Sequence, residues 1–435
     1  MSSLKEFVRR RRELMGMIGA NGIAVLAAAP ERVRSRDTLF IYRPDSDFYY
    51  LTAFPEPEAV AVLVPGRPQG EYLIFCRERN PERELWDGPR AGPEGAVDTY
   101  GADDAYPIDD LDDILPGLLE RSDRVYYSIG KSEFDQKLLA FIQTLNSKRQ
   151  SSHAPSELVA LDHLLHEMRL FKSRAEAGTM RRSAKIAVAA HERAMQLARP
   201  GMIEYELEAE FLHEFRRHGA DCSYPPIVAA GANACVLHYR ANDATLCDGD
   251  LVLIDAGCEL QMYASDITRT FPVNGVFSKP QRELYDVVLA ANRVATKAAQ
   301  AGNHWNDPHD AAVGEVTRGL KELGLLEGRV HHLIKSQAYR QFFMHRTGHW
   351  LGLDVHDVGD YKVGEQWRLL EPGMVMTIEP GIYVSPANKD VAKRWRGIGI
   401  RIEDDVLVTR DGPDVLTAAL AASVEEIEAL MAARA

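Results

Sequence analysis

The stretch LVLIDAGCELQMYASDITRTFPV, residues 251–273, decides the fold, because apolar and polar residues alternate in it as in two successive β-strands. Each strand carries an aspartate on one of its faces. The residues that share these two faces are Leu251, Leu253 and Asp255 on the first strand, and Asp266, Thr268 and Thr270 on the second. We expect a hairpin that turns near Leu260–Gln261 and places Asp255 opposite Asp266, with Cβ atoms roughly 5 Å apart.

Two later segments repeat the pattern of a strand with an acidic residue on one face. In MVMTIEPGIY, residues 374–383, Glu379 shares a face with small or polar neighbours while the methionines and an isoleucine alternate with them. In GIGIRIEDDVLVT, residues 397–409, isoleucines alternate with Arg401 and Glu403. Arg401 is therefore expected on the same side as Glu403, and a strand this apolar seldom carries a charged pair without a use for it.

An imidazole completes the acidic set, since His349 lies in HRTGHWLGLDVHD. Four carboxylates in one place would repel each other, and two divalent cations would neutralise them. The set therefore predicts a dinuclear metal site and a metal-activated hydrolase. Each residue taken singly is more often structural, because an aspartate at a strand end usually forms a turn or caps a helix. The predicted ligands are Asp255, Asp266, His349, Glu379 and Glu403.

Composition limits the class of protein. A chain of 435 residues exceeds the size of a usual single core, so two domains are expected. A net charge of −13 disfavours a nucleic-acid groove, which requires lysine and arginine. No apolar run reaches the roughly 18 residues of a membrane helix. Five cysteines without CxxC spacing indicate reduced thiols, and we expect a cytoplasmic protein.

The order of elements predicts an α/β (α+β) protein with a sheet in its N-terminal part. We expect strands at residues 22–30, 47–54, 58–66, 71–78 and 124–130, and helices at Leu4–Ile18, Leu111–Glu120, Ser132–Leu145, Glu157–Phe171 and Ser173–Ala198. The polar segment Asn146–Ser156 has the composition of a linker. A capping box from Ser423 to Glu426 begins a final amphipathic helix.

Several stretches together resemble one family. They are residues 34–60 (RSRDTLFIYRPDSDFYYLTAFPEPEAV), 166–176 (HEMRLFKSRAE), 231–243 (GANACVLHYRAND), 249–278, 345–359, 371–384 and 399–409. The chain resembles the Xaa-Pro aminopeptidases (aminopeptidase P), which have the pita-bread fold of creatinase and methionine aminopeptidase. This resemblance implies a creatinase-like α/β domain at residues 1–168, which serves oligomerisation and substrate access. It also implies a pita-bread catalytic domain at residues 169–435.

The resemblance also implies roles for individual residues. Asp255 holds one metal ion, Asp266 and Glu403 bridge both, and His349 and Glu379 hold the second. Manganese is the family's usual metal, and an oxygen-rich set with one imidazole also suits Mn²⁺ on its own terms, with Co²⁺ or Zn²⁺ as alternatives. Non-ligand roles in substrate binding or transition-state stabilisation fall to His238, His345, His356, Arg401, Tyr383 and Trp86.

The expected reaction removes the first residue from peptides that have proline in the second position. A hydroxide that bridges the two cations would attack the scissile carbonyl. Glu379 would pass the proton of the attacking water to the proline nitrogen, and His356 would stabilise the oxyanion. His238 and His345 would line the pocket for the proline ring.

Three alternatives use the same fold. A prolidase, which cleaves only Xaa-Pro dipeptides, would keep the same ligands but need positive charge for the free carboxylate, and the strand pattern places only Arg401 there. A metal-free creatinase-like hydrolase or a non-catalytic binding homologue would be expected to lose ligands, and all five are present. The expected partners are peptides and further copies of the chain, as a dimer or tetramer, with neither nucleic acid nor membrane.

Overall fold

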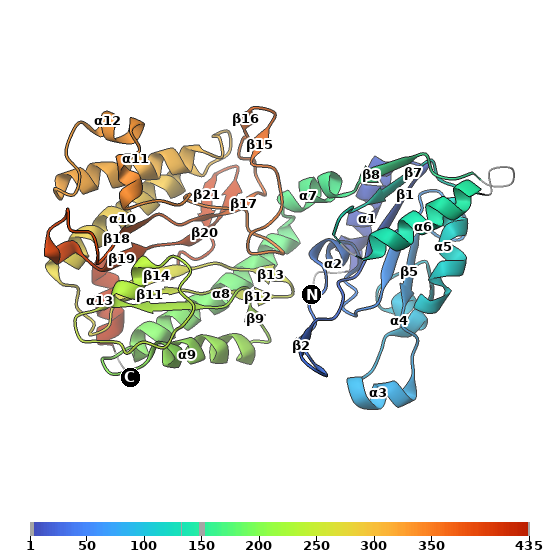
Figure 1. Ribbon diagram of the computed structural model, residues 1–435, viewed down its shortest axis with the longest axis horizontal. Helices are drawn as coiled ribbons and strands as arrows, with labels where there is room; N and C mark the ends of the chain where they lie inside the picture. The colour runs from blue at the N-terminus through green and yellow to red at the C-terminus, as the bar shows by residue number, and fades with distance from the viewer. Residues whose placement is uncertain (1–3, 132, 148–152, 434–435) are drawn as a thin grey trace. The chain divides into compact units, whose positions relative to one another are not determined.

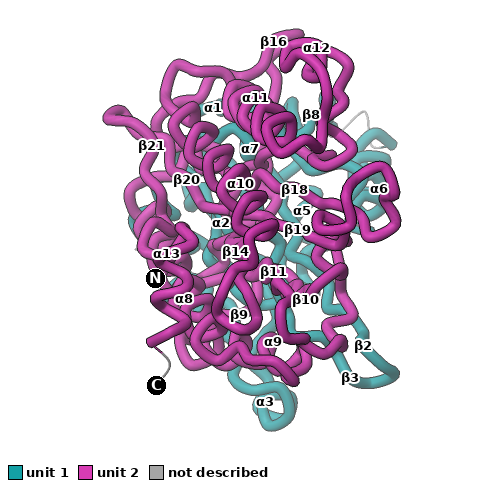
Figure 2. The backbone as a smooth tube through the Cα atoms, turned by 90° about the vertical axis from the view of Figure 1, so that its left-hand side faces the viewer, with its two compact units in different colours: residues 1–168 teal, residues 169–435 magenta. Residues whose placement is uncertain are grey.

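The computed structural model describes residues 4–131, 133–147 and 153–433. The chain forms two compact units, residues 1–168 (unit 1) and residues 169–435 (unit 2), which Figure 2 distinguishes by colour. Within the described ranges, no helix is both long enough and apolar enough to cross a lipid bilayer.

Unit 1 is built on one mixed sheet of six strands in the order β6-β5-β4-β1-β7-β8. The strands are β1 (Gly22–Ala27), β4 (Val60–Leu63), β5 (Tyr72–Cys76), β6 (Asp104–Pro107), β7 (Arg124–Tyr127) and β8 (Glu157–Ala160). The central pairs β1–β4 and β4–β5 are antiparallel, while β5–β6, β1–β7 and β7–β8 are parallel. A separate hairpin pairs β2 (Val33–Ser35) with β3 (Thr38–Leu39).

Unit 1 also contains seven α-helices within the described residues. They are α1 (Leu4–Ile18), α2 (Ser46–Thr52), α3 (Pro81–Asp87), α4 (Gly92–Asp98), α5 (Leu111–Leu119), α6 (Phe134–Ser147) and α7 (Asp162–Leu170), which reaches the unit boundary. Leu111, Leu115 and Leu119 recur every four residues, so α5 buries one face in the core of the sheet. On α1, the buried Arg10 and Arg11 donate hydrogen bonds to backbone carbonyls of α2.

Two predicted elements of unit 1 are wrong. Residues 47–54 were expected as a strand but form α2, because the side chain of Asp45 caps the helix by accepting from the Phe48 N–H. Residues 157–160 were expected as helix but form β8, which pairs with β7 along the sheet. The predicted linker therefore joins α6 to β8 within unit 1, and its residues 148–152, like Ser132, lie outside the described residues.

Unit 2 places several small sheets between two helix pairs. In Figure 1, most of its strands lie between the pair α8 (Arg174–Leu197) and α9 (Glu204–Arg217) and the pair α10 (Lys279–Ala298) and α11 (Asp307–Glu322), while the hairpin at residues 362–367 projects at the top. The remaining helices are α12 (Val330–Lys335) and α13 (Val424–Ala432). Capping boxes begin α8 at Ser173 and α13 at Ser423, and the one at Ser423 is predicted from the sequence.

The sheets of unit 2 follow the orders β10-β11-β14, β13-β12-β9, β17-β20-β21, β18-β19 and β15-β16. The strands are β9 (Asp221–Cys222), β10 (Ile227–Ala230), β11 (Leu251–Asp255), β12 (Cys258–Leu260), β13 (Tyr263–Ala264), β14 (Thr268–Pro272), β15 (Lys362–Val363), β16 (Gln366–Trp367), β17 (Val375–Ile378), β18 (Gly381–Val384), β19 (Ile398–Arg401), β20 (Asp404–Thr409) and β21 (Gly412–Val415).

The register of the aspartate hairpin differs from the prediction. The turn is centred on Gln261 and Met262, which both have positive φ, one residue further along than expected. Asp255 is consequently paired with Thr268, so Asp266 lies diagonally across from it instead of opposite. The two carboxylates still lie close enough to bind one tyrosine hydroxyl, described below.

Candidate active site

Hydrogen bonds across two strands bring the acidic residues of separate sheets together. Thr270 Oγ1 on β14 accepts from the Arg401 N–H at 3.2 Å and donates to the Arg401 carbonyl at 3.1 Å. The Glu403 N–H donates to the Thr268 carbonyl at 3.0 Å. These bonds hold the end of β19 beside β14, so the acid that follows β19 faces the pair of aspartates.

All five predicted ligands line one cavity of about 360 Å³ within unit 2. The same cavity is lined by His238, His345, His356 and Arg401, which the sequence also singles out. Three further polar side chains on its wall were not singled out in the sequence analysis: Tyr224, Arg240 and Arg346.

The possible ligand atoms lie within coordination reach of one another. Those of Asp266, His349 and Glu403 lie within 4.8 Å of each other. His349 Nε2 is 3.4 Å from Asp266 Oδ2 and 3.9 Å from Glu379 Oε1. His349 Nδ1 donates to the Trp350 carbonyl at 2.9 Å, so Nε2 is the nitrogen that faces the acids. A backbone partner that fixes the ring in this way is typical of metal-binding histidines.

Burial of like charges dominates the electrostatics of the site. Burial and the neighbouring acids raise the pKa of the Glu403 carboxyl well above its ordinary value. Burial raises the pKa of Glu379 to about 7, against the opposing charges of His349 and Arg401. For His349 burial acts downward, but the hydrogen bond and charge of Asp266 outweigh it and raise the pKa to about 9. The pKa values of these carboxyls are raised because the site holds too little positive charge to stabilise their ionised forms. Divalent cations would supply that charge, so the residues present fit a metal site.

The guanidinium of Arg401 forms hydrogen bonds within this acidic cluster. Arg401 is buried and donates to Asp255 Oδ2 at 2.5 Å and to Thr268 Oγ1 at 3.0 Å. It also donates to the Tyr383 hydroxyl at 3.0 Å, and that hydroxyl is 2.9 Å from His345 Nε2. Since His345 Nδ1 donates to the Arg346 carbonyl, its Nε2 accepts the tyrosine proton. Tyr383 thus connects Arg401 to the histidine on the cavity wall.

Tyr224 connects the two aspartates. Its hydroxyl is 2.6 Å from Asp255 Oδ1 and 2.5 Å from Asp266 Oδ1, and burial together with these charges raises its pKa well above the ordinary value. Thr268 adds a similar contact, because its hydroxyl donates to Glu403 Oε2 at 2.6 Å. No local signal reveals Tyr224, which precedes β10 and reaches the site only through the pairing of β10 with β11.

The remaining predicted residues differ in their surroundings. His356 is exposed at the cavity, with its ring centroid 4.3 Å from that of His349 in an edge-to-face arrangement. His238 is also exposed on the cavity wall. Trp86 belongs to unit 1, where it lies on α3 with 86% of its surface exposed.

A buried ion-pair network holds the segment that carries His356. The carboxylate of the next residue, Asp357, accepts from Arg169 at 2.6 Å and from Lys172 at 2.9 Å. Arg169 also bonds Asp354 at 2.8 Å. Burial raises the pKa of Asp357, but the charges of Lys172 and Arg169 outweigh burial and hold it below its usual value. Asp354 and Asp357, in this otherwise irregular segment, therefore have their partners in RLFK, residues 169–172.

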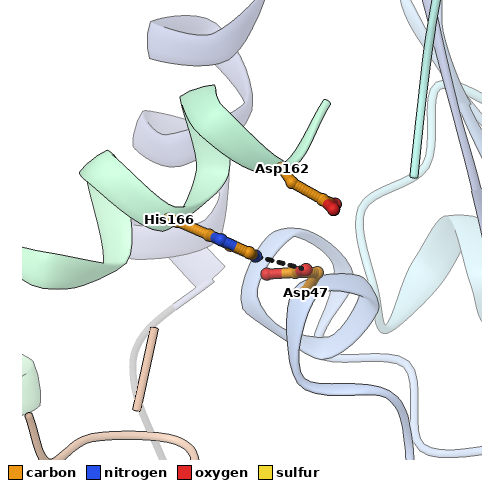
Figure 3. A group of neighbouring side chains, drawn as sticks. All are labelled: Asp47, Asp162 and His166. Carbon is orange, nitrogen blue, oxygen red and sulfur yellow. Dashed lines mark ion pairs between the residues drawn. The ribbon is translucent and has the colours of Figure 1, made fainter. Parts of the chain in front are cut away.

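A second group of possible ligands lies in unit 1. Asp47, Asp162 and His166 face one another across α2 and α7 (Figure 3), and His166 Nε2 is 3.5 Å from Asp47 Oδ2. However, Asp162 already accepts from the Ser128 hydroxyl and pairs with Lys131 at 3.0 Å. Both aspartates lie in the first turn of their helices, where negative charge is favourable. This group is adequately explained as a contact between helices.

The carboxylates and histidines that line the unit 2 cavity are typical of the active sites of metal-dependent hydrolases. Comparison with known proteins agrees. Residues 178–410 match the model of metallopeptidase family M24, and residues 7–126 match the aminopeptidase P N-terminal domain. The chain belongs to metallopeptidase family M24, which confirms both the enzyme class and the two-part α/β architecture expected from the sequence.

Full-length relatives narrow the family. The Xaa-Pro aminopeptidase of Escherichia coli (strain K12) is 45% identical, covering 99% of this chain and 98% of its own. The structure of Pseudomonas aeruginosa aminopeptidase PepP superposes with a TM-score of 0.98 at 59% identity, covering 99% of this chain and 98% of that one. Aminopeptidase P from E. coli with the inhibitor Pro-Leu gives a TM-score of 0.96 at 45% identity, over 99% of both chains. The resemblance seen in the sequence is thereby confirmed.

Proposed function

We propose that this enzyme releases the first residue from peptides with proline in the second position, using two divalent cations. One observation carries the proposal: Asp255, Asp266, His349, Glu379 and Glu403 line a single cavity in a chain whose full-length relatives include Xaa-Pro aminopeptidases. As ligands, Asp255 would serve one cation and His349 and Glu379 the other, while Asp266 and Glu403 would bridge them. Manganese is our first choice, because hard oxygen ligands predominate, and cobalt and zinc remain alternatives.

The bound cations would polarise the scissile carbonyl and lower the pKa of water at the site. The carboxylate of Glu379 would accept the proton of the attacking water and pass it to the leaving nitrogen, since a prolyl nitrogen without N–H must be protonated before it departs. His356, exposed beside His349, would donate a hydrogen bond to the substrate oxygen as it becomes negative.

The proline ring would lie against His238 and His345. Burial lowers the pKa of His345 to about 3, so its ring is neutral, and it packs edge-on against Phe343 with ring centroids 5.0 Å apart. A neutral, aromatic-backed wall suits a compact apolar ring. Arg401 and Tyr383 would hold Asp255 and His345 in place, as their hydrogen bonds indicate.

Other parts of the proposal concern the protein as a whole. We infer that unit 1 serves oligomerisation, as a dimer or tetramer, and substrate access, for which the exposed Trp86 and Leu85 on α3 provide apolar surface. A cytoplasmic location fits the lack of disulfides among the five cysteines.

One observation favours the alternative that the enzyme is a prolidase. Contrary to the sequence analysis, Arg401 is not the one positive charge at the site, because Arg240 and Arg346 also line the cavity. Either arginine could in principle capture the free carboxylate of a dipeptide.

The deciding assay uses Mn²⁺-loaded protein with an Xaa-Pro dipeptide, Xaa-Pro tripeptides to pentapeptides, and matched Xaa-Ala peptides. The proposal requires release of the first residue from the longer Xaa-Pro peptides. Rapid cleavage of the dipeptide with the longer peptides left intact would establish the prolidase instead. Equal cleavage of Xaa-Ala peptides would refute proline specificity.

A further inference from the structure

Two arginines on the wall of the active-site cavity have no assigned role, and we propose that Arg240 and Arg346 form a carboxylate-binding rim. This rim would favour peptides that carry a carboxylate beyond the proline. The inference rests on the proposed function and deepens it, because it names a substrate class within the Xaa-Pro peptides.

The first observation is that these charges are available. The third arginine of the cavity, Arg401, is buried and forms an ion pair with Asp255. By contrast, Arg240 and Arg346 are exposed, and in the described part of the chain neither forms an ion pair with a carboxylate. A guanidinium without a carboxylate partner at the wall of a substrate cavity keeps N–H donors for a carboxylate ligand, which its planar fork can match with two parallel hydrogen bonds.

The second observation is that Arg346 is held in place by neutral groups. Its guanidinium donates to the Asn306 side-chain oxygen and lies 5.1 Å from the centre of the Trp367 ring. Burial lowers its pKa, while Asp310 and Tyr339 act in the opposite direction. A cation oriented by an amide and an aromatic ring loses less freedom on binding a ligand than an unrestrained surface side chain.

The third observation is the position of both arginines next to the proposed proline wall. Arg240 follows His238 by two residues, and Arg346 follows His345 directly. His238 and His345 line the same cavity as both arginines. A peptide whose proline contacts this wall therefore brings its next residue close to the two arginines.

The two arginines at the cavity are opposite in sign to the net charge of the protein. The chain carries a net charge of −13, which repels acidic peptides at long range. Two unpaired cations beside the cavity reverse that effect locally. The carboxylate has two possible sources, the free C-terminus of a tripeptide or an acidic side chain after the proline, and the experiment separates them.

The test compares kcat/KM for four tripeptides at low salt: Ala-Pro-Glu-amide against Ala-Pro-Gln-amide for the side chain, and Ala-Pro-Ala acid against its amide for the C-terminus. Exposed charge pairs contribute up to about 1 kcal/mol, so we expect a two- to about fivefold preference for the charged member of at least one pair. The preference should reside in KM, since the contact lies outside the reacting bond, and it should shrink with added salt.

Variants assign the preference to the rim. In Arg240→Gln/Arg346→Gln the ratio within each pair should fall to about one. Arg340→Gln is the matched control, because Arg340 is exposed on η3 (Ala338–Gln341) and does not line the cavity, and it should keep the wild-type ratio. A wild-type ratio of one in both pairs, or a ratio that survives the double substitution, overturns the proposal.

A binding measurement keeps this test separate from the proposed reaction. Calorimetric titration requires no turnover and uses two pairs that resemble the product side of the substrate: Pro-Glu-amide against Pro-Gln-amide, and Pro-Ala acid against Pro-Ala-amide. Tighter binding of the acidic member of at least one pair to wild type but not to the double variant supports the rim even if the tripeptides are not hydrolysed, an outcome that would refute only the proposed function. Equal binding within both pairs by the wild type overturns the rim.

Discussion

Replacing Lys172 by methionine should lower the free energy of unfolding of unit 2 more than removing an exposed ion pair from the same unit. The Lys172 side chain is 1% exposed, and its ammonium donates to Asp357 Oδ2 at 2.9 Å. Methionine fills nearly the same volume, so the cavity cost is small, but Asp357 keeps only Arg169 as a charged partner. Breaking a buried ion pair in this way costs about 3–5 kcal/mol. For a unit of this size that corresponds to a fall in Tm of roughly 6–20 °C.

The matched control is Asp414→Asn, which removes an ion pair with Arg181 whose side chains are 37% and 45% exposed. Such a pair contributes less than about 1 kcal/mol. Urea unfolding of the metal-loaded protein, followed by tryptophan fluorescence, would measure both variants, since Trp305, Trp350, Trp367 and Trp395 all lie in unit 2. If Lys172→Met lost no more stability than Asp414→Asn, the network would not anchor the segment that carries His356.

Three further predictions follow from the site. Glu403→Ala should lose metal, measured by elemental analysis, and all activity while circular dichroism stays unchanged; full activity would contradict the dinuclear site. His356→Ala should lower kcat by about 10²–10³-fold at wild-type metal content, because it would act as a hydrogen-bond donor and not a ligand; loss of one metal equivalent would contradict that role. Because the pKa of Asp357 is depressed in the fold, its stabilisation is present above the unfolded value near 3.9 and is lost as pH falls through the lower folded value. The stability difference between wild type and Lys172→Met should therefore narrow below about pH 4, as thermal unfolding across pH would show.

The sequence by itself determined the residues of the site and the class of fold. Alternation along residues 251–273, 374–383 and 397–409 placed each acid on a polar strand face, and all five predicted ligands do line one cavity. The period of two is a local property of the strand, so it can be read without knowing what the strand packs against. The same holds for the capping box at Ser423, where a side chain bonds the backbone three residues away.

Only the tertiary structure decided which residues surround those acids. Tyr224, Arg240 and Arg346 were not singled out from the sequence, because pairing between distant strands and packing of loops bring them to the cavity. The one-residue shift of the hairpin turn likewise depended on which two residues adopted positive φ, and it moved Asp266 from opposite Asp255 to a diagonal position. Residues 157–160 became a strand because β7 offered an open edge for pairing, which outweighed their helical pattern. Contacts between distant parts of the chain have no signature in local periodicity, so the wall of the site had to be found in the folded molecule.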